Sequence, residues 1–166
     1  MDLDTFHALA PADAVEVLRP CADVADWIAA LVAGRPYADR SDLLAFAASE
    51  AAGWGPAEID AALAQHPRIG ERREGADAEA ALSRSEQAGV QQSSGAGDAA
   101  AIAAGNVAYE EKFGRIFLIR AAGRTSAEVL EQLTARLGND PGTEDGVVAG
   151  QLREIALLRL GGIIDG

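Results

Sequence analysis

Ser126-Ala-Glu-Val-Leu-Glu-Gln-Leu-Thr-Ala-Arg-Leu-Gly138 is the segment that most directly predicts the fold class. Its apolar side chains recur at spacings of three and four residues, so they share one face of a helix. Ser126 is a suitable N-cap, because its hydroxyl can accept a hydrogen bond from an N–H of the first turn. Gly138 is suited to end the helix. The apolar positions are Val129, Leu130, Leu133 and Leu137.

The same helical period continues through most of the chain, in which alanine and leucine supply most of the apolar content. Further helices are predicted from Pro11 to before Pro20, from Val24 to before Gly34, from the cap Ser41 onward, from Pro56 to His66, from Ala78 to about Val90, from Ala99 to Lys112 and from Thr143 to Leu160. Expected buried positions in the last helix are Val147, Leu152, Ile155, Leu158 and Leu160. The charged segment 68–77 and the Ser- and Gly-rich segment 91–98 are predicted loops, and residues 116–120 a short extended run. The sequence therefore predicts an all-α, single-domain bundle of about seven to eight helices over residues 1–166.

The composition excludes several classes of protein. The net charge of −12 argues against nucleic acid and against an anionic membrane as partner, because both bind basic surfaces. The single cysteine, Cys21, allows no internal disulfide. The N-terminal residues lack the basic and apolar regions of a signal peptide, and no stretch approaches the roughly 20 apolar residues of a membrane span. We therefore expect a cytoplasmic protein that binds neither nucleic acid nor membrane.

His66 is the first candidate for chemistry, because imidazole titrates near neutral pH. It falls at the end of the helix that Pro56 opens, and Pro67 prevents further helix after it. A histidine there can point into a cleft, or it can be a solvated residue at the helix C-terminus. With only His7 and Cys21 as other nitrogen and sulfur ligands, both distant in sequence, no zinc spacing is present and no metal is predicted.

Ser83, Glu86 and Gln87 form a second candidate cluster. Their spacings of three and four residues place them on one face of a helix, where they could line a polar site. The alternative is a capping box, with Ser83 as N-cap and Glu86 at the third helical position. Spacing alone leaves both interpretations open.

Arginine supplies the remaining candidates. Arg159 stands between Leu158 and Leu160 in the last predicted helix, and Arg120 follows the apolar run. An arginine flanked by leucines can extend to the surface along its aliphatic stem. Alternatively, it can be a buried anchor for a carboxylate, which the guanidinium fork binds with two hydrogen bonds.

Together, these segments resemble one enzyme family, the 2-oxo-4-hydroxy-4-carboxy-5-ureidoimidazoline (OHCU) decarboxylases of urate catabolism. The resemblance runs from about Asp4 to Ile164 and rests on several segments that occur in the family's order and spacing. They are His66-Pro-Arg-Ile-Gly70, Ser83-Arg-Ser-Glu-Gln-Ala-Gly89, Asn106-Val-Ala-Tyr-Glu-Glu-Lys-Phe-Gly114, Phe117-Leu-Ile119, and Leu152-Arg-Glu-Ile155 running into Arg159-Leu160.

The resemblance implies an all-α homodimer that uses no cofactor. It also implies a carboxy-lyase that acts on a small ureidoimidazoline and produces (S)-allantoin. The residues that match the family's catalytic positions are His66, Glu86 and Arg159. Those that match its substrate-binding positions are Pro67, Ser83, Gln87, Phe117, Leu118, Ile119, Arg120 and Ala121.

One segment departs from the family pattern. Many members have Phe-Pro-Phe after Lys-Phe-Gly and then a basic residue before the next glycine, where this chain has Arg115-Ile-Phe117 and Ala122. Arg120 lies two positions before Ala122. Two other functions are compatible with the residues alone. One is a non-catalytic helical interaction module, and the other is a hydrolase of the same ureide pathway in which His66 and Glu86 activate water.

Overall fold

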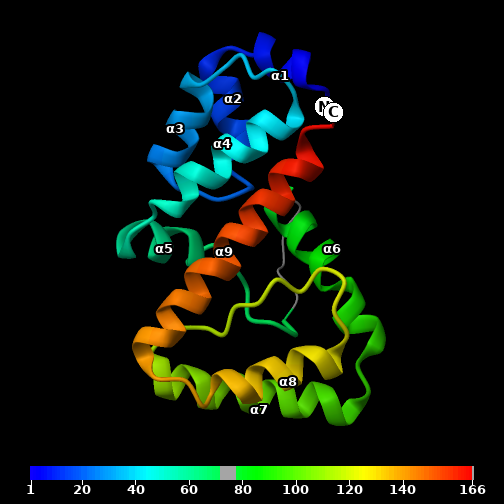
Figure 1. Ribbon diagram of the computed structural model, residues 1–166. Helices are drawn as coiled ribbons and strands as arrows, with labels where there is room; N and C mark the ends of the chain where they lie inside the picture. The colour runs from blue at the N-terminus through cyan, green and yellow to red at the C-terminus, as the bar shows by residue number, and fades with distance from the viewer. Residues whose placement is uncertain (72–77, 166) are drawn as a thin grey trace. The chain divides into compact units, whose positions relative to one another are not determined.

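The computed structural model describes residues 1–71 and 78–165, and within these ranges the chain forms nine α-helices and no β-strand (Figure 1). The predicted all-α fold is therefore confirmed. Eight of the nine helices have eight residues or more, as many as the periodicity predicted, and the additional one is the six-residue helix α1. The helices are α1 (Leu3–Ala8), α2 (Pro11–Leu18), α3 (Ala25–Ala33), α4 (Arg40–Ala52), α5 (Pro56–Leu63), α6 (Ala78–Ser93), α7 (Ala96–Phe113), α8 (Ser126–Arg136) and α9 (Pro141–Ile163).

The described residues form two compact units. Residues 1–65 with 152–165 make up unit 1, and residues 66–71 with 78–151 make up unit 2. The long helix α9 contributes its first turns to unit 2 and its last turns to unit 1. The expectation of a single domain over residues 1–166 stays a prediction. No helix in the described ranges is long and apolar enough to cross a membrane.

Unit 1 is centred on a buried tryptophan of α3. Trp27 donates from Nε1 to the backbone oxygen of Ala47 in α4 at 3.0 Å. Its ring meets that of Trp54 edge-on, with 5.8 Å between the centroids. Trp27 therefore connects α3 with α4 and with the residue Trp54 beyond it, and α2 packs on the same helix α3.

The two ends of the chain lie together in unit 1 (Figure 1). The Met1 nitrogen donates to the Ile163 backbone oxygen at 2.7 Å, and the Asp165 N–H donates to the Met1 oxygen at 2.7 Å. Arg40 of α4 donates from Nε to the Ile164 backbone oxygen at 3.0 Å. Helix α4 therefore also holds the segment that ends the chain.

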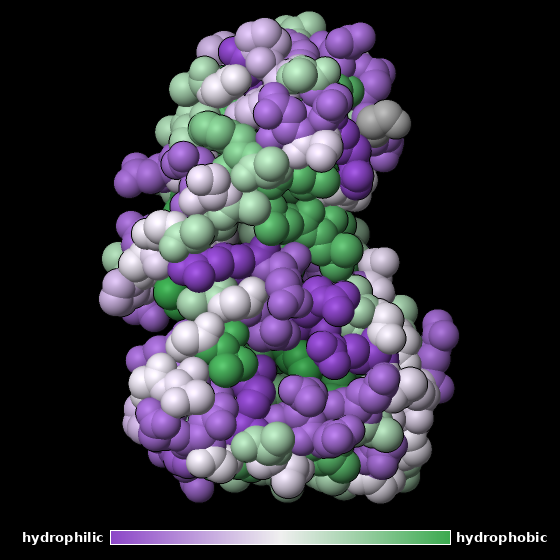
Figure 2. Space-filling model, in the orientation of Figure 1, coloured by the Kyte–Doolittle hydropathy of each residue, from purple (hydrophilic) through white to green (hydrophobic). Residues whose placement is uncertain are grey.

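Unit 2 is built on the close packing of α7 against α8. A Cβ atom at Gly105 of α7 would lie 2.4 Å from Cδ2 of Leu133 in α8, so only a glycine allows this approach without a shift. The face of unit 2 that Figure 2 presents is mainly hydrophilic or intermediate in hydropathy, with some hydrophobic side chains among them. The buried cluster inside unit 2 contains Ile69, Val90, Ile102, Tyr109, Phe117, Ile119, Ala121, Val129 and Leu133.

The N-cap residue of α8 differs from the predicted one. Thr125, not Ser126, is the N-cap, and it forms a capping box with Glu128: the Thr125 N–H donates to Glu128 Oε2 at 2.7 Å. Ser126 lies in the first turn, where its buried hydroxyl donates to Asp98 Oδ2 in α7 at 2.7 Å. The serine therefore links two helices instead of capping one.

Other predicted boundaries also shift. Asp39, not Ser41, caps α4, because its Oδ1 accepts the Asp42 N–H at 2.9 Å. The predicted loop 91–98 is largely helical, since α6 ends at Ser93 and α7 begins at Ala96. Of the predicted loop 68–77, residues 72–77 lie outside the described residues.

Candidate active site

His66 lies in irregular backbone after α5. The helix ends at Leu63 and its C-cap is Ala64, so His66 is two residues beyond the cap. A residue that precedes a proline is held out of the helical conformation, which explains the early end. The interpretation of His66 as a C-terminal helix residue is therefore wrong. Its side chain is half-buried.

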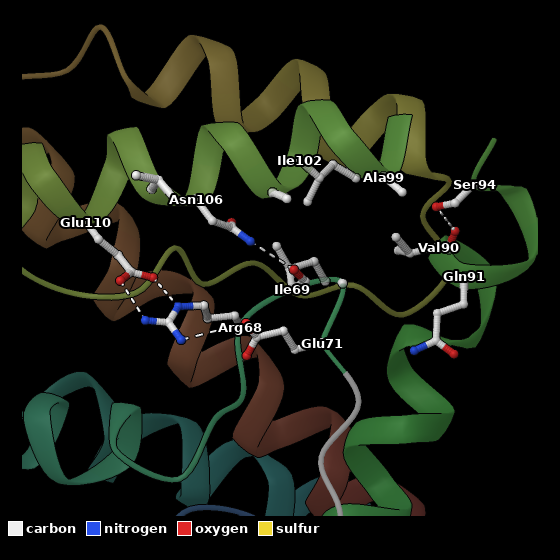
Figure 3. Close-up of a pocket in the computed structure, with 13 residues that line it drawn as sticks. Arg68, Ile69, Glu71, Val90, Gln91, Ser94, Ala99, Ile102, Asn106 and Glu110 are labelled. Carbon is white, nitrogen blue, oxygen red and sulfur yellow. Dashed lines mark hydrogen bonds and ion pairs between the residues drawn. The ribbon is translucent and has the colours of Figure 1, made fainter. Parts of the chain in front are cut away.

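Side chains from α6 and α7 bond to the backbone that follows His66, and the one from α7, Asn106, is drawn in Figure 3. The Gly70 N–H donates to Gln87 Oε1 of α6 at 3.0 Å. Asn106 of α7 donates from Nδ2 to the Ile69 backbone oxygen, also at 3.0 Å. Gly70 has φ +87°, a conformation that side-chain-bearing residues rarely adopt. Two helices thus determine the path of the segment that begins at His66.

An ion pair adds a third connection to this segment (Figure 3). Both carboxylate oxygens of Glu110 in α7 accept hydrogen bonds from Arg68, with Nη2 and Oε2 2.8 Å apart. The hydrogen bond from Arg68 holds the pKa of Glu110 below its ordinary value. Because the guanidinium is exposed, the pair contributes little to stability, and its main effect is on the direction of the segment.

These residues form part of the wall of a cavity of about 480 Å³ within unit 2 (Figure 3). Its other side is made by Val90 and Gln91 of α6 and by Ile102 of α7. Among the described residues that line it, none of His66, Ser83 and Glu86 occurs. The described lining of the cavity therefore includes the segment that follows His66, from Arg68 to Glu71, but not the predicted catalytic residues of unit 2.

Ser83, Glu86 and Gln87 lie together on one face in the middle of α6. Ser83 and Gln87 are buried, and Glu86 is half-buried. Since the helix begins at Ala78, Ser83 cannot be its N-cap, and the capping-box interpretation is wrong. The burial of polar side chains is unusual for a solvated helix face and suits a site.

Residues 117–121 form a segment without regular secondary structure. Phe117, Leu118, Ile119 and Ala121 are buried, and buried backbone groups need hydrogen-bond partners. Side chains supply several of them, including Arg124, whose Nε donates to the Arg120 oxygen at 3.0 Å. The Leu118 oxygen accepts a hydrogen bond from Arg136 Nη1 at 2.7 Å. The Arg120 N–H donates to Gln151 Oε1 at 2.9 Å.

A buried polar network supports this segment. Glu144 accepts hydrogen bonds at Oε1 from Arg136 Nε (2.8 Å) and Nη2 (2.5 Å) and from the Tyr109 hydroxyl. Its Oε2 accepts a hydrogen bond from Asn139 Nδ2 at 2.8 Å. The Arg136 guanidinium also lies over the Phe117 ring, 4.6 Å from the centroid. Three helices, α7, α8 and α9, thereby meet at one buried ion pair.

The hydrogen bonds set the charge states of the network. Burial acts to raise the pKa of Glu144, but hydrogen bonds from Arg136, Tyr109 and Asn139 outweigh it, and the pKa lies below its ordinary value. Burial, together with the bond to Glu144, raises the pKa of Tyr109 to about 12. Glu144 is therefore charged and Tyr109 neutral near pH 7. Glu144 lies in the first turn of α9 and Arg136 in the last turn of α8, ends at which the helix dipole favours these charges.

Arg159 belongs to unit 1, whereas the other predicted site residues belong to unit 2. Its side chain is 2% exposed, and Nη1 donates to the Pro20 backbone oxygen at 3.0 Å. The interpretation of Arg159 as an arginine that extends to the surface is therefore wrong. Leu158, which was expected in the core, is 43% exposed instead. At about 100° per residue, a helix that buries Leu152 and Ile155 turns Arg159 inward and Leu158 outward.

Comparison with known proteins identifies the family of this chain. The family model described as OHCU decarboxylase matches residues 7–161. The chain belongs to the OHCU decarboxylase family. The curated 2-oxo-4-hydroxy-4-carboxy-5-ureidoimidazoline decarboxylase of Amia calva is 34% identical over 167 aligned positions, which cover 99% of this chain and 95% of that protein. The predicted family and its carboxy-lyase class are thus confirmed.

One further curated protein and two solved structures are also similar to this OHCU decarboxylase family member. The uric acid degradation bifunctional protein TTL of Arabidopsis thaliana is 46% identical over 55 residues, or 33% of this chain and 17% of that protein. A crystal structure of an OHCU decarboxylase in the presence of (S)-allantoin has a TM-score of 0.73 at 26% identity and covers 86% of this chain and 92% of its own. A crystal structure of an (S)-allantoin synthase shares the fold, with a TM-score of 0.73 at 20% identity, over 99% of this chain and 55% of its own.

Sequence reasoning did not single out the residues of the buried network. Arg136 and Glu144 have no role in the sequence analysis, and Tyr109 enters it only as part of the segment from Asn106 to Gly114. One signal was present: Arg136 follows Leu133 by three residues, which places a charge on the apolar face of α8. The reason for the glycine that ends His66-Pro-Arg-Ile-Gly70 is visible only from its backbone angle.

Proposed function

We propose that this protein decarboxylates 2-oxo-4-hydroxy-4-carboxy-5-ureidoimidazoline to (S)-allantoin, without a cofactor, in urate catabolism. The observation that carries the proposal is membership of the OHCU decarboxylase family over residues 7–161. The burial of Ser83 and Gln87 on one face of α6, in the unit that also holds His66, supports a polar site there.

The chemistry of the substrate explains why no cofactor is needed. Its carboxylate is on C4, and the neighbouring C5 is doubly bonded to a ring nitrogen. When the bond from C4 to the carboxylate breaks, its electron pair forms a C4–C5 double bond while the C=N electrons move to the nitrogen. The ring nitrogen takes up a proton. A second proton is then added at C5, while the C4 hydroxyl loses its proton and becomes the C4 carbonyl of allantoin. The protein has to orient the carboxylate, stabilise the developing charge and deliver the proton to one face.

His66 is the proposed proton donor, because imidazole can hold a proton near neutral pH and release it to carbon. Glu86 is proposed to bind the ring or the C4 hydroxyl and to keep the histidine in its protonated state. Arg159 would anchor an anionic or ureido end of the substrate. Ser83 and Gln87 would bind polar ring atoms, and Pro67 and residues 117–121 would form the remaining wall.

We also propose that the protein is cytoplasmic and that it is a homodimer, the assembly that the family resemblance implies. Sedimentation equilibrium measures the assembly directly. A mass of twice the 17.1 kDa of one chain is expected, and a mass of one chain at micromolar concentration would contradict the dimer.

The activity is tested in an assay that generates the substrate enzymatically in the same solution. Urate is mixed with urate oxidase and hydroxyisourate hydrolase, this protein is added, and optical activity is followed. Rapid appearance of (S)-allantoin is expected. No acceleration over the spontaneous, racemic decay would favour a non-catalytic interaction module. Turnover of hydroxyisourate or allantoin supplied alone would favour a hydrolase.

The role of His66 is tested by replacing each histidine in turn. His66→Asn is expected to lower the rate of (S)-allantoin formation by about a hundredfold or more, because general acid catalysis contributes that much. His7→Asn is the matched control, because the His7 Nε2 atom accepts the Tyr37 N–H in unit 1 and has no proposed catalytic role. Near-native stereospecific activity in folded His66→Asn would exclude His66 as the donor.

A further inference from the structure

We propose that Arg136, Glu144 and Tyr109 are positioning residues of the decarboxylation, which hold the backbone of residues 117–121 in place as a wall of the substrate pocket. This inference rests on the proposed function, because that function makes the segment part of the pocket. None of the three touches substrate in this proposal; they act through the backbone at Leu118 and the ring of Phe117.

The need for such residues follows from the backbone of the segment. It belongs to no helix or strand, so it lacks the regular hydrogen bonds that give those elements their shape. Arg136 holds its first half, with Nη1 on the Leu118 oxygen at 2.7 Å and the guanidinium plane over Phe117. Gln151 holds its second half at the Arg120 N–H.

Glu144 and Tyr109 in turn hold Arg136. Nε and Nη2 of Arg136 both donate to Oε1 of Glu144, which leaves Nη1 directed at Leu118. The Tyr109 hydroxyl donates to the same carboxylate oxygen. The planar guanidinium can donate to Glu144 and to the Leu118 oxygen at the same time. A lysine ammonium has one nitrogen and cannot keep this geometry.

Stability alone does not account for the pair. Arg136 and Glu144 are 5% and 0% exposed, and two charges this deep lose their hydration. Well-packed apolar residues in place of such a pair are often as stable or more stable. What the apolar residues cannot supply is a directed donor at the Leu118 oxygen. The arrangement is therefore better explained by the geometry that it imposes on residues 117–121.

The decisive variant replaces the ion pair by a neutral pair of similar size, Arg136→Met with Glu144→Gln. It keeps the volume and leaves no uncompensated buried charge, but it removes the donor at Leu118. We expect kcat to fall about tenfold to a hundredfold, with a smaller rise in KM, because misplacement of a wall acts mainly on transition-state geometry. Tyr109→Phe, which keeps the ring contacts with Phe113 and Phe117, is expected to have a smaller effect of the same kind.

Leu31→Ala is the matched control for lost stability, because Leu31 is fully buried in the core of unit 1. At a temperature where all variants are folded, it is expected to keep the native kcat. Hydrogen exchange of the peptide that covers residues 117–121 gives a second readout that needs no activity. Exchange there should accelerate in the neutral pair and in Tyr109→Phe, but not in Leu31→Ala.

The outcomes separate the two proposals. If the wild-type protein does not accelerate (S)-allantoin formation, the proposed function fails, and the positioning role of the network in catalysis fails with it. If the wild type is active and the folded neutral pair keeps the native kcat, only the positioning role is overturned. Unchanged exchange at residues 117–121 would overturn it independently of any activity.

Discussion

Gly70 has φ +87°, and its N–H is the group that ties the His66 segment to Gln87. A Cβ at this position would meet only Ile102 Cγ2, at an ordinary contact distance of 3.7 Å, so the effect of Gly70→Ala is set by the backbone and not by packing. We expect a loss of about 1–2 kcal/mol in the free energy of unfolding, the usual penalty for a left-handed alanine. Urea denaturation measures it.

The same substitution elsewhere in the chain provides the control. Gly146 lies in α9 with open space around its Cβ position. Gly146→Ala is expected to raise the free energy of unfolding by about 0.5–1 kcal/mol, because alanine has the better helix propensity. Equal effects of the two substitutions would contradict the role assigned to the backbone angle of Gly70.

For individual residues, the sequence was a better guide to which polar side chains are candidates for a site than to which side chains contact each other. The burial of Ser83, Gln87 and Arg159 is compatible with their selection as site candidates. The pairing of Arg136 with Glu144 was not predictable from spacing, because the two residues lie in different helices and meet only through the turn between α8 and α9. Their proximity is a property of packing, which periodicity does not report.

Helices α7 and α8 approach each other at Gly105, where a Cβ would lie 3.0 Å from Leu133 Cγ and closer still to Cδ2. Gly105→Ala therefore adds a methyl group to a filled space, which costs about 1–3 kcal/mol. Leu133→Ala leaves a cavity that costs about 2–5 kcal/mol. In the double variant the new methyl group occupies part of that cavity.

We expect the double variant to be more stable than the sum of the single effects predicts, by about 1 kcal/mol or more. A double-mutant cycle in urea measures this coupling between Gly105 and Leu133. Strict additivity of the two substitutions would show that the helices do not meet at these positions.

The elements themselves were largely predictable, because each long helix repeats its apolar residues with the helical period. Helix α1 was missed because its six residues are too few to show a period. The caps were misplaced at α4 and α8 because Asp39 and Thr125 stand within two residues of the equally plausible caps Ser41 and Ser126. The predicted loop 91–98 was too long, because the small residues that suggest flexibility also fit the ends of α6 and α7.

The response of the whole molecule to acid follows from its carboxylates. Hydrogen bonds outweigh burial at Glu144 and hold its pKa below the ordinary 4.5. A group whose folded pKa is depressed contributes stability above its unfolded pKa and loses it as pH falls through the folded value. Glu110 and Glu128 shift in the same direction, but they face solvent, which screens their contribution.

Between pH 7 and the sequence pI of about 4.5, the net charge of −12 declines and with it the self-repulsion of the chain. We therefore expect the midpoint of thermal unfolding to change little from pH 7 to pH 5 and to fall steeply below pH 4.5. Circular dichroism at constant ionic strength measures the profile. Glu144→Gln should show a shallower decline below pH 4.5, and an unchanged decline would assign the acid sensitivity to other groups.

The hydrogen bonds of Met1 with Ile163 and Asp165 hold the first and last described residues next to each other. A short glycine and serine linker can therefore join the two ends without crossing the fold. Gly95, between α6 and α7, is exposed and has open space around it, so new ends can be opened there. A circularly permuted gene would then begin with α7 and end with α6, and the sites for fusion partners would move from unit 1 to unit 2.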